Sequence, residues 1–222
     1  MRVLTTIILM LLAFGSSAQL SISAGTSMLK QFQPTKPWGG FHVSLEIPRD
    51  DAISLYGRYT HHFKQDTQDP FTPSDYMIYV EPRDPNSGAI GEFIGATPSM
   101  NYNIIEGGTR YYLGNGFDYG WAAYGGSNFL LAFNKIKVEY DPYDEAIFQV
   151  AEASRLDGSI ISLGFGLGGG AKYSTATMGT FYLDLNVAYM IFAQGNKNPL
   201  FTEMYNPLIF SLNLGYRKDI VW

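Results

Sequence analysis

Hydrophobic and polar residues alternate along most of the chain, in segments of roughly ten residues. Between positions 181 and 191, for example, Phe181, Leu183 and Leu185 alternate with Tyr182 and Asp184. A period of two is typical of a β-strand whose two faces meet different surroundings. Eight segments carry the pattern: 20–25, 41–47, 53–60, 105–113, 117–124, 161–168, 181–191 and 210–217.

The connections between these segments alternate strictly in length. The short ones lie at 48–51, 114–116 and 174–178. The long ones lie at 28–38, 64–101, 134–158 and 193–206. Outer-membrane barrels have short periplasmic turns and long external loops. The chain is therefore predicted to be all-β, an eight-stranded antiparallel up-and-down transmembrane β-barrel with long extracellular loops.

The first of the very long loops, 64–101, contains a predicted hairpin. Residues 84–88, with the sequence DPNSG, are a strong turn signal between the apolar segments 76–80 and 89–96. These two arms are too short to span a bilayer, so the hairpin does not raise the strand count.

The next very long loop, 134–158, is predicted to carry a short helix over the barrel mouth. Asp141 suits a helix cap and Pro142 suits the first helical position. Arg155 would lie in the last turn, and Gly158 would end the helix.

The N-terminus predicts export. Arg2 supplies a positive charge, the run from Val3 to Phe14 is mostly apolar, and residues 15–18 are small. This order is that of a secretory signal peptide, and the apolar run is too short for a spanning helix. We expect a signal peptide at 1–18 and a barrel domain at 19–222, a mature chain of 222 − 18 = 204 residues.

Composition and charge narrow the function classes. The chain has no Cys, which excludes disulfides and Cys-ligated metals. Without Arg2, 14 basic residues stand against 20 acidic ones, a net charge of −6 that disfavours nucleic acid as a partner. The 24 Gly, 16 Tyr and 15 Phe favour strands and turns over helices. No cofactor is predicted.

The last alternating segment ends close to a terminal aromatic residue, Trp222. Together with the signal peptide and the alternation of short and long connections, this ending resembles the small eight-stranded outer-membrane barrels of the OmpA-barrel and OmpX type. The resemblance covers residues 19–222. The resemblance implies an outer-membrane location and recognition of Trp222 by the barrel assembly machinery. Such families include adhesins, tethers, accessory subunits and a few lipid-modifying enzymes, so the fold does not choose a function.

If the apolar faces point to lipid, the polar faces line the lumen. The charged lumen residues would be Glu46, Arg58, Glu106, Arg110, Asp118, Asp184 and Arg217, with His42 beside them. The interior of an eight-stranded barrel is just wide enough for side chains to fill, and buried charges must be paired. We expect a structural network that plugs the lumen, with Glu106 and Arg110 on one strand and Glu46 and Arg58 on neighbouring strands. The alternative is a narrow pore.

One pattern suggests catalysis: His42, Ser44 and Glu46 resemble the His-x-Ser pair of outer-membrane lipid A deacylases. Spaced two apart on a strand, these side chains stand about 7 Å from one another, too far for direct hydrogen bonds. They also face the lumen instead of lipid, so we prefer a structural polar lining. The neighbours His61 and His62 point to opposite faces of a strand and do not predict a metal site.

Aromatic residues fall into two predicted groups. A girdle at the membrane interfaces is expected from Trp38, Tyr59, Tyr111, Trp121, Tyr189, Phe192 and Tyr216. In the loops, candidates for contact with a protein or a glycan are Tyr76, Tyr79, Phe93, Tyr140, Tyr143 and Phe148. The other interpretation of the loop aromatics is that they pack over the barrel mouth.

The preferred function is that of a non-enzymatic integral outer-membrane barrel, either a structural or accessory subunit or a binding and adhesion protein that works through its loops. Besides a loop partner, we expect contact with outer-membrane lipid. The alternatives are a lipid A deacylase-like enzyme, a narrow pore and a soluble, lipocalin-like secreted barrel with an apolar lumen.

Overall fold

The computed structural model describes residues 20–32, 36–66, 76–114, 119–155, 157–195 and 206–220. Within these residues, ten strands and one 3-10 turn form the chain. The elements are β1 (Leu20–Gln31), β2 (Trp38–Pro48), β3 (Ile53–Asp66), β4 (Tyr76–Pro82), β5 (Glu92–Gly114), β6 (Gly120–Tyr140), β7 (Phe148–Val150), η2 (Glu152–Ser154), β8 (Gly158–Thr175), β9 (Gly179–Gly195) and β10 (Leu208–Ile220).

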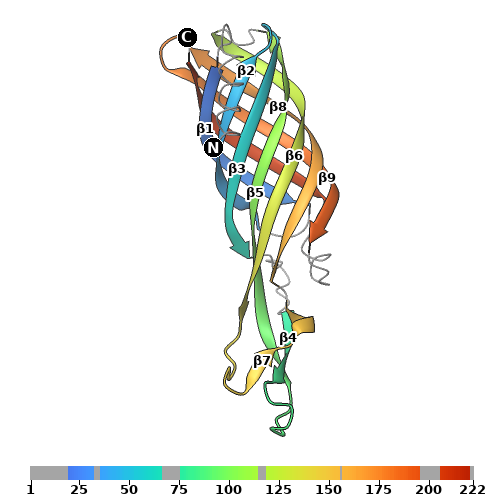
Figure 1. Ribbon diagram of the computed structural model, residues 1–222. Helices are drawn as coiled ribbons and strands as arrows, with labels where there is room; N and C mark the ends of the chain where they lie inside the picture. Colours follow the sequence, from blue (N-terminus) through green and yellow to red (C-terminus); the bar gives the residue numbers. More distant parts are fainter. Residues whose placement is uncertain are drawn as a thin grey trace, which may run out of the picture.

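Eight of the described strands close into a barrel (Figure 1). Antiparallel pairing runs β1–β2–β3–β5–β6–β8–β9–β10, and β10 pairs back with β1. Closure leaves none of these eight strands with an open edge inside the barrel wall, as a sheet surrounded by lipid requires. The predicted eight-stranded up-and-down barrel is confirmed.

The outer surface of the barrel is apolar. Side chains such as Leu163 (49% exposed), Leu185 (46%) and Leu214 (57%) project outwards, while their neighbours along each strand are buried inside. Six of the seven predicted girdle aromatics are also exposed. The prediction for the seventh, Trp38, is wrong: this residue is completely buried and donates its indole N–H to the Met100 carbonyl at 2.8 Å.

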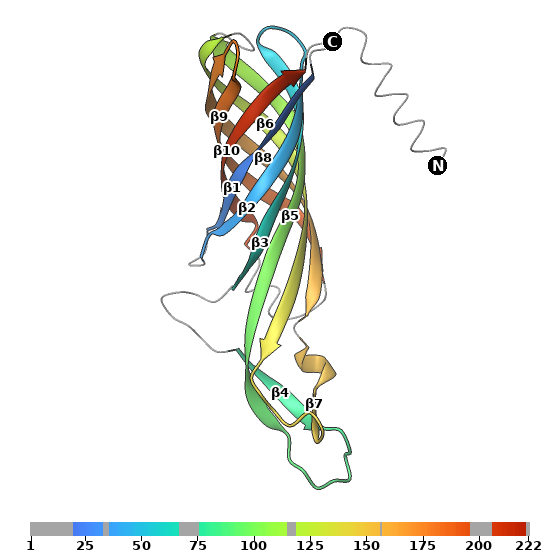
Figure 2. The ribbon, with the colours of Figure 1, turned by 90° about the vertical axis from the view of Figure 1, so that its left-hand side faces the viewer.

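The short β2–β3 and β8–β9 connections lie at one end of the barrel, called here the turn end, where β5 ends and β6 begins (Figure 2). In the β2–β3 turn, the Asp50 carboxylate accepts the backbone N–H groups of Ala52 and Ile53 at 2.9 and 2.8 Å. The β8–β9 turn ends at Gly179, whose φ of 96° is a left-handed conformation that favours glycine. Residues 1–18 and Trp222 lie outside the described residues.

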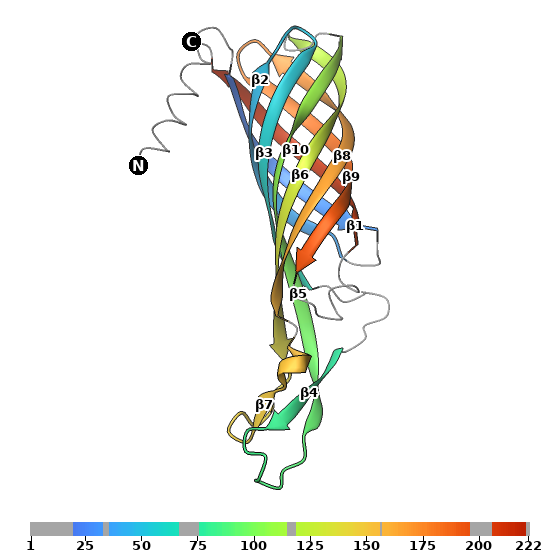
Figure 3. The same ribbon diagram turned by 45° about the vertical axis from the view of Figure 1, so that its right-hand side comes forward.

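At the opposite end, called the loop end, β5 and β6 continue far beyond the other strands (Figures 1 and 3). Their ladder runs without a break from Gly114↔Ala122 to Ala96↔Tyr140. Strand β4 adds to the far part of β5, and β7 adds to β4. We call this projecting part, the described residues of 76–98 and 138–157, the arm. The predicted hairpin at 76–96 is present, but its second strand is the continuation of a barrel strand.

The alternation of apolar and polar residues reverses its phase along β5 and β6. Near the turn end, Ile105 is exposed and Glu106 is buried. Towards the loop end, Met100 and Tyr102 are buried and the outward-facing Asn103 is half-buried. Consecutive apolar residues mark the change on three strands: Ile104–Ile105, Leu130–Leu131 and Ile160–Ile161. The strands leave lipid for water on the outside, while the interior changes from charged to apolar.

The helix predicted from Asp141 is wrong. Residues 148–150 form strand β7 against β4, and the loop carries only the single 3-10 turn η2 within its described residues. Tertiary pairing overrides the local helix signals, because the edge of β4 offers backbone partners and an apolar face. No helix in the described part of the chain is long and apolar enough to cross a membrane.

Candidate functional site

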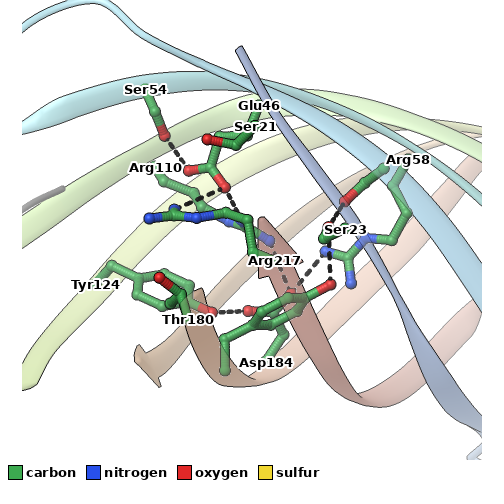
Figure 4. Close-up of polar contacts among 12 residues, drawn as sticks. Ser21, Ser23, Glu46, Ser54, Arg58, Arg110, Tyr124, Thr180, Asp184 and Arg217 are labelled. Carbon is green, nitrogen blue, oxygen red and sulfur yellow. Dashed lines mark hydrogen bonds and ion pairs between the residues drawn. The ribbon is translucent and has the colours of Figure 1, made fainter. Parts of the chain in front are cut away.

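The lumen near the turn end holds a cluster of buried ion pairs (Figure 4). Arg58 contacts Glu106 at 2.7 Å and Asp184 at 2.9 Å. Arg110 contacts Glu46 at 2.6 Å and Asp184 at 2.8 Å. Each of these side chains is at most 6% exposed. The two arginines therefore bridge carboxylates that come from β2, β5 and β9.

Six of the seven predicted lumen charges thus lie inside the barrel, and Asp118 lies outside the described residues. Arg217 joins them with an Nη1–Oε2 distance of 3.3 Å to Glu46. The partners differ from the predicted neighbours: Arg58 pairs with Glu106, its direct cross-strand partner, and Arg110 reaches Glu46. Residues four apart on one strand, such as Glu106 and Arg110, are separated by about 13 Å.

Tyrosines complete the cluster. Tyr112 and Ser54 donate hydrogen bonds to Glu46, both at 2.5 Å, and Tyr124 donates one to Asp184. The Arg110 guanidinium lies 4.4 Å from the centre of the Tyr56 ring. These tyrosines lie on the polar faces of their strands, so the alternation alone would have placed them in the lumen.

Lys172 was missed by the sequence analysis. It is buried in the lumen and donates to Ser174 at 3.0 Å. The sixth predicted segment stopped at 168, whereas β8 continues to Thr175. Extending the alternation by four residues would have found it.

Towards the loop end, the lumen is filled by apolar side chains. The buried residues there are Leu29, Trp38, Met100, Tyr102, Ile104, Leu130, Ala132, Ile160, Ala188, Met190 and Ile209. Beside the ion pairs, a cavity of ≈ 20 Å³ is lined by Arg58, Arg110 and Asp184 among others. That volume holds about one water molecule. Charges at one end and an apolar layer at the other close the barrel.

We therefore expect no steady conductance from the purified protein in planar bilayers. An ion would have to break the Arg58 and Arg110 pairs and then cross the apolar layer. Single-channel recordings test this expectation, with detergent alone as the control. Reproducible current steps that scale with salt would contradict it.

The three residues that suggested catalysis each contact a different partner. His42 Nε2 lies 2.7 Å from the Tyr182 hydroxyl, and Ser44 Oγ lies 2.5 Å from Ser23 Oγ. Glu46 is held by the arginines described above. The arrangement does not build the relay from carboxylate to His to Ser that an activated serine needs.

Nor do the described side chains suggest a metal centre. His62 is buried and contacts Ser27 Oγ at 3.0 Å, whereas His61 contacts Asn103 on the outer face at 2.8 Å. No group of His, Cys, Asp or Glu side chains in the described ranges is arranged to hold a metal ion.

The six loop aromatics divide between the two faces of the arm. Tyr76, Tyr140, Tyr143 and Phe148 are partly buried against the apolar cluster that fills the lumen mouth. Tyr79 and Phe93 lie opposite each other on β4 and β5, with ring centres 5.3 Å apart, and Phe93 is 65% exposed. Among the described residues, the inner face of the arm thus continues the lumen core, whereas its outer face carries exposed side chains such as Met77 and Phe93.

The outer face of the arm changes from apolar to charged side chains between the tip and the barrel. The tip carries the Tyr79–Phe93 pair, and next comes Met77, opposite Gly95. Nearer the barrel, Glu139 pairs with Lys64 at 2.6 Å, and the Lys64 ammonium holds the pKa of Glu139 below its usual value. The exposed Lys137 and Lys135 follow, next to the apolar belt.

No family model and no curated protein matches the chain. Among solved structures, it is similar to Neisserial surface protein A, with a TM-score of 0.46, 13% identity and coverage of 91% of this chain and 96% of that one. For a major outer membrane protein of Thermus thermophilus, the TM-score is 0.46 and the identity 14%, with coverage of 91% of this chain and 100% of that one. For Ail of Yersinia pestis, in complex with the heparin analogue sucrose octasulfate, the TM-score is 0.43 and the identity 11%, with coverage of 90% of this chain and 97% of that one.

The likeness is one of fold. What decides the class of this chain is its own surface. Within the described residues, eight strands form a closed wall that is apolar on the outside and holds paired charges inside. This is the architecture of an outer-membrane β-barrel.

Proposed function

We propose that the protein is a non-enzymatic integral outer-membrane barrel that presents the arm to a binding partner outside the cell, as an adhesion or accessory component. In this proposal, residues 1–18 direct export and Trp222 takes part in barrel assembly. The closed barrel serves as an anchor, and the arm carries the contact.

The observation that supports this function is the continuity of β5 and β6 from the barrel into the arm. The arm is thereby a sheet with its own buried apolar face, joined to the wall by an unbroken ladder, and not a set of separate loops. A preorganised surface loses less entropy on binding than a mobile loop does. The lumen offers no comparable surface, because ion pairs fill it near the turn end and apolar side chains fill it near the loop end.

Outer-membrane lipid is the second proposed partner. The apolar belt supplies contacts for lipid chains. Lys135 and Lys137 lie just beyond the belt on β6, where ammonium groups attract anionic head groups.

Site-specific photo-crosslinking in intact cells of the natural host tests the arm function. A photoreactive residue at Phe93 is expected to give discrete protein or glycan adducts. The same residue at Trp121, which is 72% exposed at the turn end of the barrel, serves as the control. Lack of adducts at Phe93, or the same adducts at both positions, would contradict the proposal.

A shortened variant provides a second test. Asp66 lies opposite Ser99, and Ile136 lies opposite Gly158, so each pair accepts a two-residue turn in place of the arm. We expect this variant to insert as a heat-modifiable barrel and to lose the partner found at Phe93.

A further inference from the structure

We propose that the outer face of the arm tip, formed by Met77, Tyr79 and Phe93 between Glu81 and Asp141, binds a cationic protein segment with apolar side chains among its basic residues. We call this surface the tip face. The inference rests on the proposed function and specifies the chemistry of the partner.

The tip face is an apolar sheet surface that no other segment of the described residues covers. Met77 is 59% exposed and Phe93 is 65% exposed, although the opposite face of the same strands is buried. The Tyr79 side chain lies along the sheet, since a Cβ on Gly91 would approach its hydroxyl. Clustered, exposed apolar side chains of this kind mark contact sites in soluble surroundings.

Carboxylates lie beside the apolar centre. The Asp141 carboxylate lies over Gly95, directly opposite Met77, and its backbone N–H is fixed by the Gly95 carbonyl at 2.9 Å. At the other side, Glu81 Oε1 accepts a hydrogen bond from Gln149 at 3.1 Å. The backbone of Asp141 and the side chain of Glu81 are therefore held in position beside the tip face.

The whole arm is strongly acidic. Over 76–98 and 138–157 it carries nine carboxylates and two arginines, a net charge of −7. The full chain has a net charge of only −5, so the rest of the protein is close to neutral. The negative field is thus concentrated where the apolar face is exposed, and it would steer a cationic partner towards that face.

The same observations disfavour other occupants. Phe93 of the tip face is about 40 Å along β5 from Ile105, the first exposed apolar residue of the lipid belt on this strand, at about 3.3 Å per residue, and the Lys64–Glu139 ion pair lies between them. A second copy would bring two arms of charge −7 together. An anionic glycan would meet the same repulsion.

Binding of labelled peptides to the full-length protein in zwitterionic nanodiscs tests the inference. The probes are peptides of about ten residues, a length that fits one sheet face, with alternating Lys and Leu, Lys and Ser, or Glu and Leu. Fluorescence anisotropy is read against empty nanodiscs. We expect the Lys–Leu peptide to bind at least about tenfold more tightly than the other two, and more weakly as salt is added.

Variants locate the binding surface. The double change Met77→Ser and Phe93→Ser should weaken Lys–Leu binding by about tenfold or more. Asp141→Asn should weaken it further than Glu92→Gln, because Glu92 lies opposite Val80 and its side chain points to the other face. Heat-modifiable migration shows that each variant is folded.

Several outcomes would overturn the inference. Equal binding of the Glu–Leu peptide would remove the charge argument, and equal effects of Asp141→Asn and Glu92→Gln would show that only net charge matters. Tight binding of heparin through the tip face would also overturn it. If crosslinks form at Phe93 but no Lys–Leu peptide binds, the partner chemistry is wrong and the arm function stands.

Discussion

Replacing Asp184 with alanine is expected to lower the free energy of unfolding by about 3–5 kcal/mol, the cost of breaking a buried ion network. Asp184 is the carboxylate shared by Arg58 and Arg110, so its loss leaves two buried guanidinium groups short of a partner. Unfolding by urea in detergent micelles, followed by tryptophan fluorescence, measures the change.

The matched control is Glu139→Gln, which breaks the exposed ion pair with Lys64. Their side chains are 76% and 45% exposed, so water replaces the lost contact. We expect the urea midpoint of this control to stay where it is in the parent protein. Equal stability of Asp184→Ala and the parent protein would show that the lumen network does not hold the barrel together.

The second large effect is expected for Leu185→Arg in the apolar belt. Leu185 is 46% exposed near the middle of β9, where a charge facing lipid costs about 2–4 kcal/mol. Folding into phospholipid bilayers, followed by heat-modifiable gel migration, should be less efficient and less stable than for the parent protein.

Met77→Arg is the control for this prediction, because Met77 is similarly exposed but lies on the arm. The two changes introduce the same side chain, so a difference between them reports the surrounding medium. If both variants folded with equal stability, the outer face of the barrel would not be in contact with lipid.

The barrel was predictable where one face of a strand meets lipid. Leu183, Leu185 and Val187 alternate with lumen residues, and the sequence alone defines strand β9. The arm was not predictable by the same criterion. On β5 the apolar phase changes at Ile104–Ile105, and a pattern search that assumes one phase stops there. A search for such phase reversals would have extended β5 and β6.

The alternation predicted which charged residues lie in the lumen, but it did not predict which of them form ion pairs with one another. Arg110 reaches Glu46, two strands away along the wall, and this depends on the curvature of the closed barrel. The tip face was only partly visible in the sequence. Tyr79 and Phe93 were predicted as contact candidates together with four residues that pack inwards, because the pairing of β4 with β5 decides which side chains share a face.

The unbroken β5–β6 ladder also determines how the protein responds to a pulling force. Hydrogen bonds between antiparallel strands lie perpendicular to the strand axes. A load applied at Phe93 along β5 therefore acts on the ladder from Ala96↔Tyr140 to Gly114↔Ala122 in shear, with many bonds strained together. A partner held at the tip would therefore be tethered to the barrel wall through a mechanically resistant connection.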